Sequence, residues 1–487
     1  MFYSGAPANP PVRNRHSPRN GRFMYMPESV AFIDTHAHIE GKEFQADIGE
    51  VLERAAAAGV SRMITIGTDI ESSRKACELT THHDEIYCSV GVHPHDAVRV
   101  TEKSYEIIRQ LAVETPKNIA IGEIGLDFYR DRSPRDVQEI VFRRFLIMAS
   151  ELSLPVIIHD RDAHEPLLRI LREEKSRGLR GVLHCFSGDL EMARECVDLG
   201  FHLSIPGTVT FPGNDLLRSV VRGIRMESLL LETDCPYLSP VPYRGKRNEP
   251  AYLRITAEKV AEVKGLSLED VARITTLNAE TLFGLGLKEQ QASIAYKIRN
   301  SLYLNITNRC SNHCSFCAKF SDFLVKGHFL KLNHEPSADE VMSAIGDPSG
   351  YDEVVFCGYG EPLLRLDLVK EVAGRLKKMG CRVRINTDGQ ANLVYGRNIL
   401  PELAGLVDAI SVSLNAADAE SYQQLCTSPF GSAGFAGVCD FLVEAKKHIP
   451  TVVASAVTVP GLEIETVRRL AESLGVIFRE REYADVG

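Results

Sequence analysis

A chain of 487 residues is longer than one hydrophobic core usually organises, so two or three domains are expected. Its apolar fraction of 44% and charged fraction of 25% are ordinary for a globular protein, and no apolar run is long enough to predict a membrane-spanning helix. The formal net charge of −9 excludes a general basic surface that would hold nucleic acid non-specifically. A nucleic-acid substrate would therefore have to be bound locally.

The cysteines indicate a reducing compartment. Of the twelve in the chain, only Cys310, Cys314 and Cys317 are closely spaced, which favours thiolate ligands over a framework of disulfides. Residues 1–28 combine arginines with helix-breaking prolines and contain no acidic residue before Glu28. We expect this segment to be a disordered tail, or sequence upstream of a later start, and we expect the protein to be cytoplasmic.

From Val30 onward, short apolar runs alternate with segments whose apolar residues recur at helical spacing. Eight strands are predicted, at Val30–Asp34, Arg62–Ile66, Ile86–Val92, Ile119–Ile124, Pro155–His159, Gly181–His184, Phe201–Ile205 and Ser228–Glu232. Helices at Tyr252–Lys264 and Leu268–Phe283 would complete this unit. The alternation predicts a parallel (β/α)8 barrel of the TIM type over residues 29–285, in preference to an open sheet.

Polar residues occur at the carboxyl ends of several of these strands. They are His36, His38, Glu123, His159, His184 and Asp234. Barrel enzymes place their chemistry at that end, and burying imidazoles and carboxylates is costly unless they are paired. A single histidine at a strand end is more often a hydrogen-bonded core residue than a ligand. Six such residues on one rim favour divalent cations, with zinc, manganese and magnesium left open.

The local sequences around these residues indicate a family. In order along the chain they are Phe32-Ile33-Asp34-Thr35-His36-Ala37-His38, Gly91-Val92-His93-Pro94-His95, Gly122-Glu123-Ile124-Gly125-Leu126-Asp127, His159-Asp160-Arg161-Asp162-Ala163, His184-Cys185-Phe186-Ser187-Gly188 and Glu232-Thr233-Asp234-Cys235-Pro236-Tyr237-Leu238. The stretch from about Ala31 to about Leu285 resembles the TatD-type deoxyribonucleases of the amidohydrolase-like superfamily. The resemblance implies a binuclear centre. His36 and His38 would bind one metal ion with Asp234. His159 and His184 would bind the other, and Glu123 would bridge them.

Two cations that share a water molecule make it acidic enough to supply hydroxide near neutral pH, and they also neutralise phosphate oxygens. We therefore predict hydrolysis of phosphodiester bonds, with DNA as an expected substrate. Asp234 could orient the water and accept its proton, while His93 and Arg161 could contact a phosphate. For Arg161 a solvated loop charge is an equally good interpretation. The same holds for three basic residues in the loop beyond the eighth strand: Arg244, Lys246 and Arg247.

A second alternation of strands and helices is predicted for residues 298–487, after a polar linker at 286–297. Its strands are predicted at Leu302–Thr307, Glu353–Cys357, Arg382–Asn386, Ala409–Ser413, Thr451–Val457 and Val476–Arg481. Six strands favour a partial (β/α)6 barrel over a closed one. Both halves are thus predicted to be α/β, without an evident sequence repeat between them.

Cys310, Cys314 and Cys317 lie on one loop after the first of these strands. Three thiolates can hold three irons of a [4Fe-4S] cluster and leave the fourth iron open. Zinc is the competing interpretation, but a structural zinc site needs a fourth ligand, and the spacing of His313 suits neither common finger. The C-x3-C-x2-C spacing, with Phe316 before the last cysteine, resembles the radical S-adenosylmethionine superfamily.

This resemblance implies S-adenosylmethionine as a cofactor and an electron donor such as flavodoxin or ferredoxin. Gly358-Tyr359-Gly360-Glu361-Pro362 is similar to the glycine-rich segment that contacts the methionine amino group. Ser413-Leu414-Asn415 is similar to the pair that hydrogen-bonds the ribose and the carboxylate. The cofactor contacts implied are Phe316, Gly358, Gly360, Glu361, Ser413 and Asn415. The remaining cysteines of this half show no close pairing and are predicted to be small buried hydrophobes, so one cluster is expected.

We expect a bifunctional enzyme in which a nuclease-like hydrolase is joined to a radical enzyme of unassigned substrate. The alternative is a small-molecule hydrolase, because the same barrel and metals also cleave lactones, amides or phosphoesters. In a third interpretation the cluster is a redox sensor or a folding element, although the segment that contains Glu361 favours cofactor binding. No membrane association is expected, and the sequence predicts no particular oligomeric state.

Overall fold

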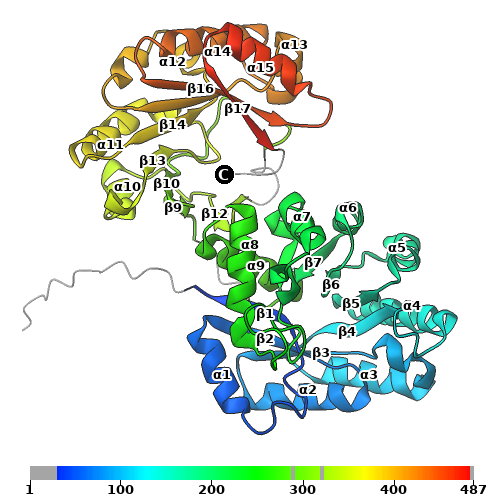
Figure 1. The fold of residues 1–487 in the computed structure, drawn as a ribbon. Helices are drawn as coiled ribbons and strands as arrows, with labels where there is room; N and C mark the ends of the chain where they lie inside the picture. The colour runs from blue at the N-terminus through cyan, green and yellow to red at the C-terminus, as the bar shows by residue number, and fades with distance from the viewer. Residues whose placement is uncertain (1–29, 287–290, 318–322, 483–487) are drawn as a thin grey trace, which may run out of the picture.

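The computed structural model describes residues 30–286, 291–317 and 323–482. Figure 1 shows two α/β units, the first coloured from blue to green and the second from yellow-green to red. The tail predicted at 1–28 and residues 287–290 of the predicted linker lie outside the described residues. No helix in the described ranges is long and apolar enough to cross a membrane.

The first unit is an eight-stranded parallel sheet whose strands lie in chain order. This order, together with contacts between the first and last strands, confirms the predicted (β/α)8 barrel. Isoleucine, valine and leucine dominate the strands because both faces of the sheet are covered. The strands are β1 (Phe32–Ala37), β2 (Val60–Ile66), β3 (Ile86–Val90), β4 (Asn118–Asp127), β5 (Val156–Arg161), β6 (Gly181–Leu183), β7 (Phe201–Ile205) and β8 (Leu229–Leu231).

Closure of the barrel brings the carboxyl ends of β1 and β8 together. The backbone N–H of Asp234 donates to the His36 carbonyl at 2.9 Å. Two residues earlier on β1, the buried Asp34 carboxylate accepts hydrogen bonds from the N–H and the hydroxyl of Thr233, which lies 199 positions away in the chain. The fold itself therefore holds the distant His36 and Asp234 side by side.

Helices cover the outside of this barrel. They are α1 (Ile48–Ala57), α2 (Ile70–His82), α3 (Glu102–Glu114), α4 (Arg135–Leu152), α5 (His164–Glu173), α6 (Leu190–Asp198), α7 (Asp215–Gly223), α8 (Leu253–Lys264) and α9 (Leu268–Phe283). The last of them, α9, closes the end where the strands begin. Its Asn278 amide donates to the carbonyls of Met226 and Leu229, just before and at the start of β8. Its Thr276 hydroxyl donates to the carbonyl of Ala31, which precedes β1. The carboxyl ends of the strands therefore form the opposite, open mouth.

The second unit is a seven-stranded sheet in the order β17-β16-β15-β14-β13-β10-β9. Six strands are parallel and match the six predicted: β10 (Ser301–Leu304), β13 (Glu353–Phe356), β14 (Val383–Thr387), β15 (Ala409–Ser413), β16 (Thr451–Thr458) and β17 (Ile477–Glu482). The seventh, β9 (Ala295–Ile298), pairs antiparallel with β10 and begins within the segment 286–297 that was predicted to be a linker. Sequence periodicity missed it because only two of its four residues are buried.

One face of the second sheet is covered by helices and carries the main apolar core. These helices are α10 (Ala338–Ile345), α11 (Leu366–Lys378), α12 (Ala391–Tyr395), α13 (Ala419–Cys426), α14 (Ser432–Ala445) and α15 (Ile464–Ser473). On the other face, a small hairpin of β11 (Leu324–Val325) and β12 (His328–Phe329) packs through Val325 against Tyr296 and Tyr359.

The two units are joined through the start of α9. The buried Asp270 carboxylate accepts hydrogen bonds from the Arg273 guanidinium at 2.6 Å and from the backbone N–H of Arg299 at 2.9 Å. Arg273 also donates to the Lys326 carbonyl at 2.8 Å, which ties the β11–β12 turn to the same helix. The second unit is therefore attached at the end of the barrel that α9 closes, away from the open mouth.

Candidate metal centre and cluster site

Glu123 lies in the mouth of the first barrel, and the local backbone aims it there. The pairing of β4 with β5 shifts register between Ile121 and Ile124, and such a bulge re-aims the side chain within it. Gly125 follows with a φ of 141°, and a Cβ at this position would lie 2.0 Å from the His159 carbonyl oxygen. Only glycine permits this approach of β4 to β5. The predicted strand ended at Ile124, whereas β4 continues to Asp127.

The first group of donors consists of His36, His38 and Asp234. His36 Nε2 lies 3.6 Å from Glu123 Oε2 and 3.7 Å from Asp234 Oδ1. His38 Nε2 lies 3.9 Å from the same Glu123 oxygen and 3.5 Å from Asp234 Oδ1. Nitrogen and carboxylate donors at these separations surround one point, as the ligands of a divalent cation do.

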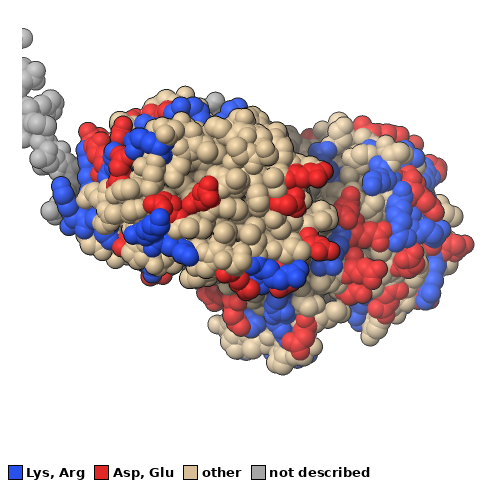
Figure 2. All heavy atoms as spheres, turned by 90° about the horizontal axis from the view of Figure 1, so that it is seen from above, with Lys and Arg blue, Asp and Glu red and all other residues tan. Residues whose placement is uncertain are grey.

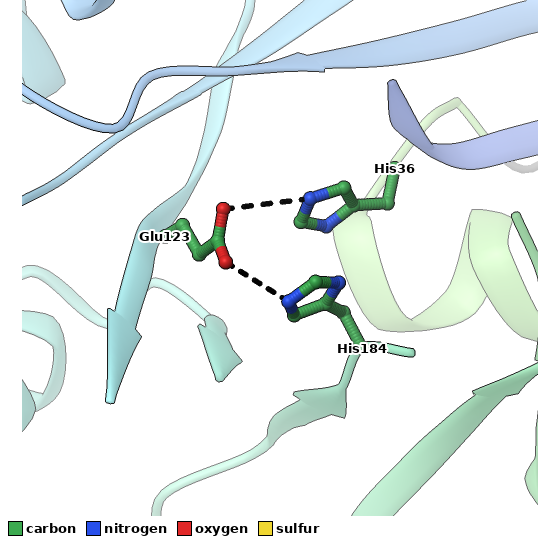
Figure 3. A group of neighbouring side chains, drawn as sticks. All are labelled: His36, Glu123 and His184. Atoms are coloured by element: carbon green, nitrogen blue, oxygen red, sulfur yellow. Dashed lines mark ion pairs between the residues drawn. The ribbon is translucent and has the colours of Figure 1, made fainter. Parts of the chain in front are cut away.

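His159 and His184 face the other oxygen of the same carboxylate. His159 Nδ1 and His184 Nε2 each lie 2.9 Å from Glu123 Oε1. The rings of His36 and His184 stack with their centroids 3.9 Å apart, and Figure 3 shows the carboxylate of Glu123 facing both rings. The two oxygens of one glutamate thus face two adjacent sets of donors, which fits a pair of cations.

Among the protein groups alone, protons on the histidines balance the buried acids. Burial opposes ionisation of Glu123, but the neighbouring imidazoles outweigh it and hold the pKa of Glu123 well below its usual value. Burial also opposes a charge on His184, yet Glu123 raises the pKa of His184 to about 10. The pKa of His38 and that of His159 are raised in the same way, against burial, by their acidic partners. Cations bound here would take over the charge that these protons carry.

Asp127 supports the centre from outside it. Its Oδ2 lies 3.2 Å from Nε2 of His159 and 2.9 Å from Nε2 of His95. A hydrogen on Nε2 of His159 leaves Nδ1, which faces Glu123, with the lone pair that a metal needs. The sequence assigned no role to Asp127 or His95. The usable signal was the spacing of four between Glu123 and Asp127, which places both on one face of a strand.

His93 differs from the other histidines of the mouth. Its Nδ1 accepts a hydrogen bond from the backbone N–H of His95 at 3.1 Å. Burial lowers the pKa of His93 to about 3, so the ring is neutral and its hydrogen lies on Nε2. That nitrogen is 3.4 Å from Glu123 Oε1. His93 therefore presents a hydrogen-bond donor to the centre, which suits contact with a phosphate oxygen better than ligation.

Two further acids that the sequence did not single out lie behind the ligands. Glu40 Oε1 is 3.8 Å from Nδ1 of His38, whose Nδ1 also lies 3.2 Å from the Ile66 carbonyl oxygen. Glu232 Oε1 is 3.8 Å from Nδ1 of His184. Acceptors on the Nδ1 side favour a hydrogen there and leave Nε2 of both rings for a cation.

The rim of the mouth carries a cation and two exposed tyrosines. The Arg161 guanidinium lies over the Tyr129 ring at 3.9 Å from its centroid, and the ring of Tyr129 is on the surface, with 55% of the residue exposed. Tyr237 is 58% exposed, and its ring centroid lies 6.1 Å from that of His38. Arg247, by contrast, forms a bidentate pair with Asp47, which supports the interpretation of Arg247 as a structural charge.

Figure 2 shows basic and acidic side chains interspersed on the face viewed from above. Ion pairs between neighbouring helices account for part of the surface charge, including Arg144 with Glu102, Arg143 with Glu174 and Arg169 with Glu139. Exposed pairs of this kind contribute little to stability. The face in Figure 2 carries no extended basic surface among its described residues, in agreement with the net charge of −9.

In the second unit, the cysteine loop is held against the C-terminal end of α13. The N–H groups of His313 and Ser315 donate to the carbonyls of Cys426 and Leu425 at 3.0 and 2.9 Å. The three cysteines of this loop, Cys310, Cys314 and Cys317, are all half-buried.

The glycine-rich segment after β13 is packed tightly beside this loop. A Cβ on Gly360 would lie 2.2 Å from the Thr307 carbonyl oxygen, and one on Gly358 would lie 2.2 Å from Oδ1 of Asn305. Glu361 is buried, and its carboxylate accepts hydrogen bonds from three donors, which are the N–H of Leu363, the N–H of Asp388 and the hydroxyl of Thr387. Gly358, Gly360 and Glu361 therefore fix the conformation of their own segment. A contact with a cofactor would be an additional role.

The other predicted cofactor contacts lie around the same loop. Phe316 is half-buried and packs against the main core of this unit. Ser413 ends β15, and Asn415 follows it with a φ of 57° and its amide 3.5 Å from the Cys426 sulfur. Of the other cysteines in this unit, Cys426 is buried as predicted, whereas Cys357, Cys381 and Cys439 are half-buried.

Comparison with known families decides what these two units are. The family model named TatD related DNase matches residues 33–284. The chain belongs to the TatD related DNase family. Residues 304–474 match the Radical SAM superfamily, so a TatD unit and a radical SAM unit share one polypeptide, and both families are enzymatic. Family membership confirms that the chain is a metal-dependent hydrolase joined to a radical SAM domain.

Three relatives of the TatD type each match about half of this chain. The metal-dependent hydrolase YabD of Bacillus subtilis is 45% identical over 251 residues, which cover 52% of this chain and 98% of YabD. The 3′-5′ ssDNA/RNA exonuclease TatD of Klebsiella pneumoniae is 39% identical over 258 residues, 52% of this chain and 98% of its own. The structure of YJJV, a TatD homolog from Escherichia coli, has a TM-score of 0.50 and 31% identity, covering 52% of this chain and 98% of that one.

Proposed function

We propose that the TatD unit, residues 29–285, hydrolyses phosphodiester bonds in single-stranded nucleic acid with the help of two divalent cations. The supporting observation is that Glu123 presents one oxygen to His36 and His38 and the other to His159 and His184. Two cations held this close polarise a phosphate and acidify an attacking water. Zinc, manganese and magnesium all accept this set of nitrogen and carboxylate ligands.

The remaining groups of the mouth have separate roles in this proposal. Asp234, one of the donors of the first site, also orients the water and accepts its proton. His93 donates from Nε2 to a non-bridging phosphate oxygen, and Arg161 neutralises charge at the rim. Asp127 acts through His159 and is a positioning residue.

The exposed aromatic rings favour a substrate with unpaired bases. Every base offers a face for stacking, and an aromatic side chain contributes about 1–3 kcal/mol per stacked base. Tyr129 and Tyr237 stand at the mouth with most of their surface exposed, and Arg161 already covers one face of Tyr129. A paired duplex would hide its bases from both rings, so a single strand fits this rim better than a double strand.

The test is an assay of the full chain on single-stranded and double-stranded DNA with manganese or magnesium. We expect hydrolysis of the single strand, lost in the His159→Ala and Asp234→Ala variants. We expect Tyr237→Ala to raise KM for a single strand several-fold and to leave kcat largely unchanged. Hydrolysis that survives in either of the first two variants would refute the assignment of the centre.

For residues 298–487 we propose a radical SAM reaction at a cluster bound by Cys310, Cys314 and Cys317. The cluster and S-adenosylmethionine supply the one-electron chemistry. Phe316, Gly358, Gly360, Glu361, Ser413 and Asn415 are proposed to line the cofactor pocket. A reduced flavodoxin or ferredoxin is the proposed electron source.

The test of this second role is anaerobic reconstitution of the full chain with iron and sulfide, followed by dithionite and S-adenosylmethionine. We expect 5′-deoxyadenosine in the products, and none from Cys314→Ser. The matched control is Cys439→Ser, a half-buried cysteine on α14, which should retain full activity. A reconstituted cluster without any cleavage of S-adenosylmethionine would favour a redox sensor instead.

A further inference from the structure

A cavity of about 300 Å³ lies at the junction of the two units, far from the metal mouth. The first unit contributes the end of α7, the turn before β8 and the end of α8, and the second contributes the β9–β10 turn, the β11–β12 turn and the end of β17. Figure 1 shows β12 and β17 on the side of the second unit that faces α7 and α8. Neither of the proposed catalytic sites includes these residues.

The charge of this cavity is predominantly positive. Its basic lining residues are Arg222, Arg225, Lys264, Arg299 and Lys326, and its acidic ones are Glu227 and Glu482. Arg225 lies 3.7 Å from Glu227, and Lys264 and Arg299 each donate to a backbone carbonyl. Within the described residues the Arg222 side chain has no ion pair, although it is exposed beside other cations. Grouping like charges is unfavourable unless an anion joins them.

The position of the cavity follows from the topology of the second sheet. That sheet does not close on itself, and β9 and β17 are its two edges. Arg299 immediately follows β9, and Glu482 ends β17, so both edges reach the cavity. The α7–β8 connection of the first barrel supplies the remaining wall. The junction therefore exists only because the two units are joined.

We infer that this junction is a binding site for a phosphate-bearing small molecule, with Arg222 and Arg225 as its principal contacts. Guanidinium groups bind phosphate oxygens in a bidentate manner, and a phosphate monoester brings more negative charge to a cluster of cations than a single carboxylate does. A volume of about 300 Å³ is at the lower end of small-molecule sites and suits a mononucleotide. Hydrolysis of nucleic acid by the TatD unit would release molecules of this class. The inference rests on the junction residues and does not require either proposed activity.

The experiment is equilibrium dialysis of the full chain with radiolabelled inorganic phosphate and, separately, with 2′-deoxyadenosine 5′-monophosphate. The open mouth of the barrel also attracts phosphate, so binding to the wild type alone does not identify the site. Comparison with variants of the junction arginines does. We expect the Arg222→Gln/Arg225→Gln double variant to lose one of the bound equivalents, with a dissociation constant at least about tenfold higher, because both guanidinium contacts are removed. The matched control is Arg254→Gln on the exposed side of α8, where Arg254 pairs with Glu258.

Nuclease assays and thermal unfolding of the same variants distinguish a loss of phosphate binding from a loss of folding or of hydrolysis. Both arginines are exposed, so the double variant should melt like the wild type and retain its nuclease activity. Unchanged binding of both ligands in the double variant would overturn the inference. An equal loss in Arg254→Gln would also overturn it, because the effect would then be one of general charge. If the wild type showed no nuclease activity, this would contradict the proposed role of the metal centre, but it would not affect the inference about the junction.

Discussion

The metal centre takes its donors from the ends of strands between His36 and Asp234, whereas the cysteine loop carries its three thiols within Cys310–Cys317. The first arrangement depends on closure of the barrel, which places His36 beside Asp234. The second depends mainly on local spacing, with support from the carbonyls of Leu425 and Cys426. A centre of the first kind is sensitive to changes in any strand, and one of the second kind is sensitive to changes in a single loop.

The two sites also differ in their surroundings. In the metal centre, two of the histidines have an outer hydrogen-bond partner that fixes the ring, which is Asp127 for His159 and the Ile66 carbonyl for His38. In the second unit, the buried carboxylate of Glu361 is already satisfied by backbone and hydroxyl donors. Groups behind the rings therefore orient His159 and His38, while Glu361 is held by contacts within its own loops.

The largest expected effect comes from the shared ligand. Glu123→Gln should lower nuclease activity by more than about 100-fold, because loss of even an outer partner of a ligand costs about 10- to 100-fold. Elemental analysis should show that both divalent ions are lost together, whereas a ligand of one site would lose one. The matched control is His202→Gln, a histidine of β7 outside the centre. Retention of one tightly bound ion in Glu123→Gln would contradict bridging.

The residues of this centre show what a sequence can and cannot predict. His36, His38, His159, His184 and Asp234 were predictable because strand ends of a parallel barrel share one face. Asp127 and His95 were missed because their role depends on the extension of β4 to Asp127, which strand periodicity did not indicate.

In the second unit, too, only part of the structure was predictable from the sequence. Its six parallel strands were predictable from apolar runs, and the cysteine spacing was readable directly. Strand β9 was missed because only two of its four residues are buried, and the β11–β12 hairpin was missed because its strands have two residues each. The contact of Arg273 with Lys326 was also beyond prediction, since tertiary packing alone brings them together.

The next largest effect is expected from a substitution of Asp127, which contacts His159 from outside the metal centre. Asp127→Asn keeps the size of the side chain but removes the charge that His159 and His95 share. We expect about a 10- to 100-fold loss in metal affinity or activity, measured by chelator competition and by kcat/KM. Rescue of activity by excess metal would separate this positioning role from a role in chemistry. Full activity and affinity in the variant would show that Asp127 does not position the ligand.

The pH dependence of metal binding sharpens the same point. The pKa of His184 is raised to about 10 from an ordinary value near 6.5, so a cation must displace a proton over that range. Metal affinity should therefore rise from about pH 6.5 to about pH 9, with proton release detectable by calorimetry in two buffers. When a chelator keeps the protein metal-free, protonated His184 stabilises the folded state. This contribution to the free energy of unfolding is complete below about pH 6.5 and is lost as the pH rises through about 10. An affinity that does not change with pH would contradict the assignment of His184 as a ligand.

The smallest predicted effect concerns the attachment of the two units. Burial opposes ionisation of Asp270, but Arg273 and the Arg299 N–H outweigh it and lower the pKa of Asp270. Asp270→Asn should cost about 1–3 kcal/mol in the free energy of unfolding and separate the unfolding transitions of the two units. Asp215→Asn on α7, whose carboxylate is mostly exposed, should change stability by less than about 0.5 kcal/mol. Equal behaviour of the two variants would show that Asp270 does not couple the units.

A crossed assay on full-length protein tests most directly whether one chain carries two separate reaction centres. Wild type, Glu123→Gln and Cys314→Ser would each be assayed for hydrolysis of single-stranded DNA with manganese and, after anaerobic reconstitution, for 5′-deoxyadenosine. We predict that Glu123→Gln loses only the hydrolysis and that Cys314→Ser loses only the 5′-deoxyadenosine. Loss of both activities in either variant, or survival of hydrolysis in Glu123→Gln, would contradict the account.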